Sequence, residues 1–287
     1  APAVRGVELE SDNWIVQNLS GALDTWNEKM GEIIGLLTTS PEEFRGGGIW
    51  DAVLGIHGAV QAVGLALLVL FFLTGVVRTC GTLAEAKRPE RAVALFVRFI
   101  LAKAAVTHGL ELMAAFLSVV QGLVSTILGA VGFDAATDAA LPAEMVEAIE
   151  GVDFLSSIPL WAVTLLGGVL ITVLSFVMIL SVYGRFFKLY MYTALAPVPL
   201  STFAGEPTQS VGKAFLRSYA AVCLEGAIVA LACVLFSLFA SSPPAADASL
   251  PVVTQVWGYV GELAFNMLVL VGMVRMADRV VREMMGL

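Results

Sequence analysis

AVLGIHGAVQAVGLALLVLFFLTGVV, residues 52–77, contains no Asp, Glu, Lys or Arg. A helix needs about 20 apolar residues to cross the roughly 30 Å hydrocarbon core of a bilayer, so this stretch predicts a transmembrane helix. Four further stretches predict spans on the same grounds, with approximate bounds 95–125, 159–183, 216–240 and 252–276. We therefore predict an all-α, polytopic membrane protein with about five transmembrane helices.

The second of these spans is the least regular in its composition. It lies in a proline-free stretch, 92–133, whose first half carries Arg98, Lys103, His108 and Glu111. We expect one long helix whose basic start lies at the inner interface and whose centre crosses the bilayer.

The composition of the whole chain agrees with a membrane protein. Of its 287 residues 58% are hydrophobic and 14% are charged, and the mean hydropathy is +0.87. A soluble domain carries roughly 25% charged residues, so most of this surface must face lipid or other membrane helices. We expect two parts: an extracytoplasmic amphipathic segment, 1–48, and a transmembrane domain, 49–287.

Basic and acidic residues alternate between the connections that join the predicted spans. The connection between the second and third spans has no Lys or Arg and holds Asp134, Asp138, Glu144, Glu147, Glu150 and Asp153. The connections on either side of it are basic, with Arg78, Lys87, Arg88 and Arg91 in one and Arg185, Lys188, Lys213 and Arg217 in the other. Lys and Arg concentrate in cytoplasmic loops, so the N-terminus is predicted outside and the C-terminus inside.

The N-terminal segment predicts an amphipathic helix rather than a span. Its apolar residues recur at helical spacing: Trp14, Ile15, Leu19, Leu23, Trp26, Met30, Ile33, Ile34 and Leu37. Such a helix can lie in the membrane interface or pack against the transmembrane bundle, and the sequence leaves both open. Ser40, Pro41 and Glu43 then predict a capped helix start, and Gly46–Gly48 predicts a hinge before the first span.

Polar residues occur inside several of the predicted spans. One set recurs in steps of three and four, which places it on one helical stripe: Ala104, His108, Glu111, Ala115, Ser118, Gly122, Ser125 and Gly129. Further intramembrane polar residues are His57, Gln61, Arg217, Glu225, Glu262 and Asn266. These groups either join helices or subunits, or line an aqueous path. A metal site from His57, His108 and Glu111 is chemically conceivable, but nothing fixes their distances, and we predict no metal.

Basic and aromatic residues mix after the third span, in Arg185, Phe186, Phe187, Lys188, Tyr190 and Tyr192. This mixture predicts a short helix in the inner membrane interface, near lipid headgroups, that ends at Pro197 and Pro199. An ordinary aromatic belt explains the same composition.

Enzyme signatures are missing from this sequence. The segment 205–214, GEPTQSVGKA, differs from a phosphate-binding loop because Pro207 replaces a glycine and Ala214 replaces the Ser or Thr. Neither H-E-x-x-H nor G-x-S-x-G occurs. The cysteines Cys80, Cys223 and Cys233 have no metal spacing, and we expect reduced thiols. We predict no enzyme activity, no catalytic residue and no cofactor, apart from bound phospholipid.

The run YGRFFKLYMYTALAPVPLSTFAGEPTQSVGKAFLRSYAAVCLEGAIVALAC, residues 183–233, resembles the central region of a known family. This family comprises the TrbL-type and VirB-type polytopic inner-membrane subunits of conjugative type IV secretion systems, as in Gram-positive mobile elements. The resemblance extends more loosely to the Trp26 region, the Ser40–Pro41 turn and the first span.

The resemblance implies a channel or scaffold subunit in the bacterial cytoplasmic membrane. It implies a homo-oligomeric ring in membrane lipid, with other secretion subunits and motor ATPases as partners. DNA with its attached relaxase is the implied substrate of the whole complex. The alternative is a stand-alone small-solute transporter or ion channel, which the intramembrane His57, Glu111, Glu225 and Glu262 would favour.

Overall fold

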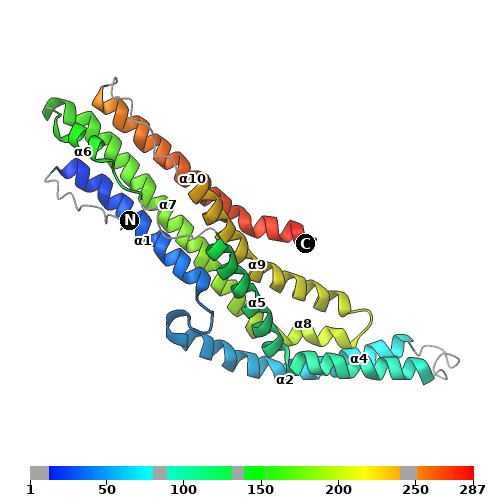
Figure 1. Cartoon of the computed structure of the whole chain (residues 1–287). Helices are drawn as coiled ribbons and strands as arrows, with labels where there is room; N and C mark the ends of the chain where they lie inside the picture. Colours follow the sequence, from blue (N-terminus) through cyan, green and yellow to red (C-terminus); the bar gives the residue numbers. More distant parts are fainter. Residues whose placement is uncertain (1–12, 80–88, 131–138, 153, 240–250) are drawn as a thin grey trace. The chain divides into compact units, whose positions relative to one another are not determined.

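The computed structural model describes residues 13–79, 89–130, 139–152, 154–239 and 251–287, and every regular element among them is helical (Figure 1). The elements are α1 (Trp14–Thr38), η1 (Phe44–Gly47), α2 (Gly48–Thr79), α4 (Pro89–Thr107), α5 (Gly109–Ala130), α6 (Ala143–Glu150), α7 (Phe154–Leu195), α8 (Pro197–Ser201), η2 (Thr202–Ala204), α9 (Gln209–Phe239) and α10 (Val252–Met285). Several residues of the charge pattern lie outside the described residues: Lys87, Arg88, Asp134, Asp138 and Asp153, together with Cys80. The side chain of Arg91 is likewise not described.

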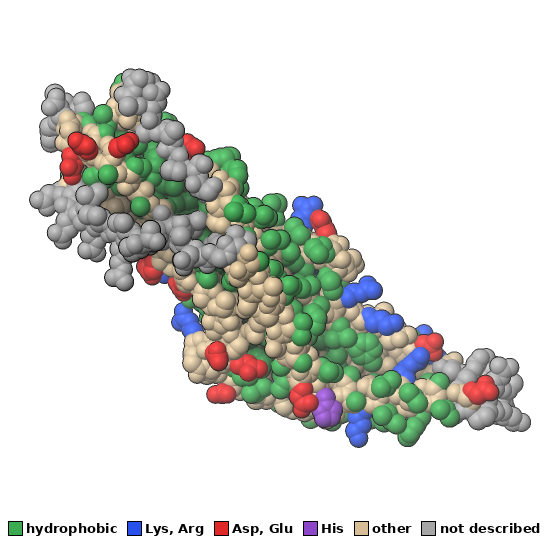
Figure 2. All heavy atoms as spheres, in the orientation of Figure 1, with side chains coloured by type: hydrophobic (Ala, Val, Ile, Leu, Met, Phe, Trp, Pro, Cys, Tyr) green, Lys and Arg blue, Asp and Glu red, His purple; other side chains and the backbone are tan. Residues whose placement is uncertain are grey.

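Five of the described helices are long and apolar enough to cross a membrane. These stretches are Phe44–Arg78, Gly109–Ala130, Ile158–Leu195, Gln209–Phe239 and Val252–Met285. Hydrophobic side chains cover much of the described surface in Figure 2, as expected where a helix faces lipid. The prediction of an all-α, multi-pass membrane protein is confirmed.

The long helix expected over 92–133 is wrong, because two helices meet at His108. Gly109 follows the break, and a Cβ there would come 2.6 Å from the Leu200 side chain, so the close approach requires glycine. The helix before the break, α4, carries Glu90, Arg98 and Lys103 and is not among the helices able to span a membrane. The span is therefore α5 alone, shifted toward the C-terminus from the predicted 95–125.

The described chain divides into two compact units, which we treat separately. The first unit comprises 1–34, 132–180 and 232–274. Gly167 lets α7 approach α10, because a Cβ there would collide with the Val260 side chain. Gly168 does the same for α1, since the Cβ position lies 3.6 Å from the Ala22 side chain.

The N-terminal helix packs against protein, which supports the second of the two predicted alternatives. Its apolar face is buried at Ile15, Leu19, Leu23, Trp26, Met30 and Ile33. Asn27 exchanges two 3.0 Å hydrogen bonds with the backbone of Ala139, so it also fixes the segment before α6. On the opposite face Lys29 hydrogen bonds to Glu28 and Glu32, which raises the pKa of Lys29 above its ordinary value.

The second unit comprises 35–131, 181–231 and 275–287. The predicted helix start is present, because the Ser40 hydroxyl accepts a 3.3 Å hydrogen bond from the Glu43 amide. The predicted glycine hinge is present as well: Gly46 and Gly47 have φ of 75° and 80°, a region that L side chains rarely adopt. In this unit α4 lies beside α2, and α8 contacts both helices (Figure 1).

Candidate functional site

A buried turn, residues 196–205, forms the centre of the second unit. Ala196, Leu200 and Ala204 belong to one hydrophobic cluster with Val106 and Met113. The turn consists of α8 and η2, and it forms because Pro197 cannot continue α7 but suits the first position of a new helix. Its polar side chains bond within the turn, as when the Thr208 hydroxyl donates to the Thr202 carbonyl at 2.8 Å. This burial without unsatisfied side chains marks the turn as a rigid support for the helices around it.

Two glycines of α2 admit the buried turn. A Cβ at Gly64 would lie 2.7 Å from the Pro197 carbonyl oxygen and 2.8 Å from the Pro197 Cβ. Gly75 meets the Gly205 Cα at 3.4 Å from the corresponding position. Backbones approach this closely only where side chains are absent, so the two glycines set the spacing between α2 and the turn.

His57 of α2 stabilises the interrupted end of α7. In a continuous helix the Thr193 carbonyl would accept a hydrogen bond from residue 197, but Pro197 has no N–H. His57 Nδ1 lies 2.7 Å from that carbonyl oxygen, and both residues are buried. The histidine therefore acts as the missing donor, which requires the proton on Nδ1.

Gln61, one turn further along α2, does the same for α4. Its amide nitrogen donates to the carbonyls of Val106 and Thr107 at 3.3 and 3.2 Å. These are the last carbonyls of α4, which the break at His108 leaves without the regular helical partners. The two polar residues predicted on one face of α2 thus each satisfy the end of another helix.

A charged cluster ties together α7, α9 and α10 in the second unit. Lys188 Nζ lies 3.3 Å from the Glu225 carboxylate and 3.0 Å from the Asp278 carboxylate, and Arg282 Nε lies 3.0 Å from Asp278. Glu225 is 9% exposed at its side chain, against 34% for Lys188. Charges this far from water are tolerated when they are paired, so the cluster specifies how the three helix segments meet.

Arg185, one turn before Lys188, is buried more deeply. It is 6% exposed, and its Nε has no hydrogen-bond partner among the described residues. Gly226 of α9 leaves the space that the guanidinium occupies, and the Cζ lies 5.2 Å from the centre of the Phe186 ring. Glu225 is the neighbouring carboxylate whose charge favours this cation.

The segment expected to lie in the membrane interface differs from that prediction. Arg185, Phe186, Lys188, Tyr190 and Tyr192 are not in a separate short helix, because α7 continues to Leu195. Phe186 and Tyr190 are buried, and the Tyr190 hydroxyl donates to the Pro41 carbonyl at 2.8 Å. Phe187 is exposed. Pro197 and Pro199 follow the end of α7, as predicted, but they begin α8.

The stripe of small and polar residues is exposed along α5. Its members there are Glu111, Ala115, Ser118, Gly122, Ser125 and Gly129, and none is buried. His108, 3.1 Å from Glu111, lies at the break, and Ala104 belongs to α4. A Cβ at Gly122 or Gly129 would meet nothing within 4 Å. The single chain thus leaves this face uncovered.

The remaining predicted polar residues lie apart from the charged cluster. Arg217 and Glu262 are exposed and Asn266 is half-buried. Asp278, which sequence reasoning missed, joins the cluster; a carboxylate four residues before Arg282 was its only sequence signal. In the described part of the chain no three His, Cys, Asp or Glu side chains gather as metal ligands. Cys223 and Cys233 are buried free thiols.

These features define a multi-pass helical membrane protein whose polar residues join helices to one another. The family model described as TrbL/VirB6 plasmid conjugal transfer like protein matches residues 26–197, which is more than half of the chain. The chain belongs to this family, and it is a membrane subunit of a conjugative transfer system of the type IV secretion class. No curated protein and no solved structure matches it.

Proposed function

We propose that the protein is a channel or scaffold subunit through which a conjugative apparatus moves DNA and its attached protein across the cytoplasmic membrane. The family match over 26–197 carries this proposal, together with five helices able to span the membrane. Motor ATPases and other secretion subunits supply the energy and the remaining wall of the path. The buried turn and the charged cluster provide the rigid frame that such a subunit needs.

Deletion of the gene from its mobile element tests this role. Transconjugants should fall to background and return when the wild-type chain is supplied in trans. Normal transfer without the protein would contradict the proposal. The alternative, a small-solute transporter, predicts flux in proteoliposomes of the protein alone, although His57 and Glu225 are engaged in helix contacts here.

The subunit assembles with copies of itself through the exposed small-residue face of α5. The most apolar windows of α2 and α5 are only 17% and 22% buried, against 61% for α9. These two helices therefore keep faces available for lipid or a neighbouring copy. Small residues allow close helix approach in a bilayer, where packing and interhelical hydrogen bonds drive association. A closed ring results if unlike faces of successive copies meet.

Gly122→Leu should reduce oligomer formation without unfolding the chain. The substituted side chain meets nothing inside the subunit but separates packed helices between subunits. The measurement is particle mass in mild detergent, with cross-linking in native membranes. Val119→Leu, on a neighbouring face where Val119 is 71% exposed, is the control and should leave the mass unchanged. A monomeric wild-type chain, or equal effects of both changes, would refute the assignment.

The N-terminus lies outside the cell and the C-terminus inside, in our proposal, because basic residues gather at Arg98, Lys103, Lys213 and Arg217. A cysteine replacing Glu147, which is exposed in α6, should react with an impermeant thiol reagent in intact cells. A cysteine replacing the exposed Glu206 should react only after the cells are permeabilised. The reverse pattern would overturn the orientation.

A further inference from the structure

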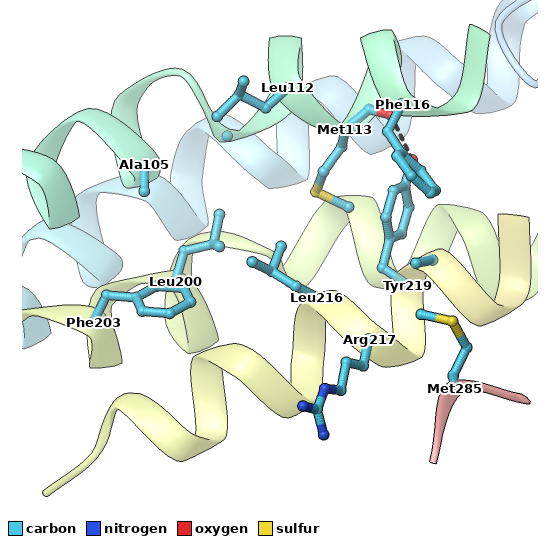
Figure 3. A pocket seen from close by; sticks show the side chains of 12 residues that line it. Ala105, Leu112, Met113, Phe116, Leu200, Phe203, Leu216, Arg217, Tyr219 and Met285 are labelled. Carbon is cyan, nitrogen blue, oxygen red and sulfur yellow. Dashed lines mark hydrogen bonds between the residues drawn. The ribbon is translucent and has the colours of Figure 1, made fainter. Parts of the chain in front are cut away.

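An open cavity of about 450 Å³ lies in the second unit, between α5, α9, η2 and the last turn of α10 (Figure 3). Its walls include Met113, Phe116, Leu200 and Phe203. Leu112 and Leu216 also line it and are exposed, at 62% and 42%. A space of this size is within the range that holds a small-molecule ligand.

The walls are chemically suited to hydrocarbon rather than to a polar solute. Among the side chains that line the cavity, only Tyr219 and Arg217 carry polar groups. The Tyr219 hydroxyl is already used, because it donates to the Met113 carbonyl at 2.9 Å (Figure 3). A ligand inside therefore finds apolar contacts and no free hydrogen-bonding group except the arginine.

Arg217 supplies the charge at the edge of this cavity. Figure 3 shows its guanidinium extending away from Leu216 and Tyr219, past the apolar walls. The structure gives this exposed arginine no ion pair among the described residues. A cation beside an apolar space complements a ligand with a hydrocarbon tail and an anionic head.

The position along the helices also fits a lipid. Gly109 begins α5, and Arg217 lies eight residues after the start of α9, so the cavity is near the ends of two membrane-spanning helices. Phospholipid headgroups lie at that depth, with their acyl chains beside the helices. A free anion would gain nothing from the apolar walls.

We propose that this cavity binds one anionic phospholipid, with an acyl chain against Met113 and Phe116 and the headgroup phosphate at Arg217. The inference rests on the chain being a membrane protein and does not depend on the substrate that the apparatus moves. Binding fills the space between α5 and α9 and thereby stabilises the second unit.

Photolabelling of the full-length protein in nanodiscs tests the site. The probe is phosphatidylglycerol with a diazirine in its acyl chain, and labelled peptides are identified by mass spectrometry. Labels are expected in 109–116 and 216–220. Arg217→Gln should lower labelling about fivefold, the effect of one basic charge near an anionic surface. Lys213→Gln, an exposed lysine one turn away that does not line the cavity, should leave it unchanged.

Two further arms separate this proposal from its rivals. Ala220→Trp fills the cavity and should abolish the specific labels, and Leu216→Trp at the mouth serves if the first variant does not fold. Inorganic phosphate should not compete, and diazirine phosphatidylcholine should label more weakly. Labelling that survives a folded tryptophan variant, equal labelling by both lipids, or cross-links from these peptides to a neighbouring copy would overturn the proposal.

Discussion

Glu225→Leu should destabilise the protein by about 3 kcal/mol, the largest effect that we expect from a single charge removal. The substitution deletes the carboxylate of a side chain that is only 9% exposed. Lys188 keeps Asp278 as a partner at 3.0 Å, but the buried Arg185 loses its nearby negative charge. A buried cation without a partner is much less stable than the original pair. The free energy of unfolding, measured by SDS titration from mild-detergent micelles, gives the result.

A second substitution distinguishes loss of a pair from loss of packing. Arg185→Met in the Glu225→Leu background removes the orphaned cation and should restore part of the lost stability. Glu283→Gln is the control, because its ion pair with Arg279 is 64% exposed at the glutamate and should contribute less than about 0.5 kcal/mol. If the double variant is less stable than Glu225→Leu by the full cost of Arg185→Met alone, the two residues are independent and this explanation fails.

Gly64→Ala and Gly58→Ala should change stability in opposite directions although both add one methyl group to α2. At Gly64 the new Cβ lies 2.7 Å from a backbone oxygen of the buried turn, so the helix and the turn must separate. Overpacking of this kind costs about 1–3 kcal/mol. At Gly58 the Cβ meets nothing within 4 Å, and replacing glycine in a helix stabilises it by up to about 1 kcal/mol.

Both variants are measured by the same SDS titration and by transfer frequency in mating. Gly64→Ala should lower both quantities, because α2 then loses contact with the turn that orients α4 and α8. Gly58→Ala should retain transfer. Equal stability of the two variants would show that α2 and the turn do not approach as closely as described.

His57 illustrates how far sequence reasoning reached at the site. The missing N–H of Pro197 implies that the Thr193 carbonyl needs another donor, and that much can be deduced from the sequence. The donor itself is 136 residues away. The polar face of His57 and Gln61 was predicted, but its partners were not, because contacts between distant residues leave no local pattern.

The break at His108 shows the opposite limit. The stretch 92–133 has helical residues throughout and no proline, so its local preferences favour one helix. Gly109 interrupts it because Leu200 occupies the space of a side chain there. The basic residues of α4 were correctly expected before the span, but the end of one helix and the start of the next depended on tertiary packing.

The sequence by itself determined the helical class, the five apolar spans and the buried face of α1, because length, composition and helical period are local quantities. Only the tertiary structure decided that α7 ends on His57, that Lys188 joins Glu225 to Asp278, and that α5 keeps its small-residue face uncovered. These features depend on which distant surfaces meet, and burial and pairing energies between them select the arrangement.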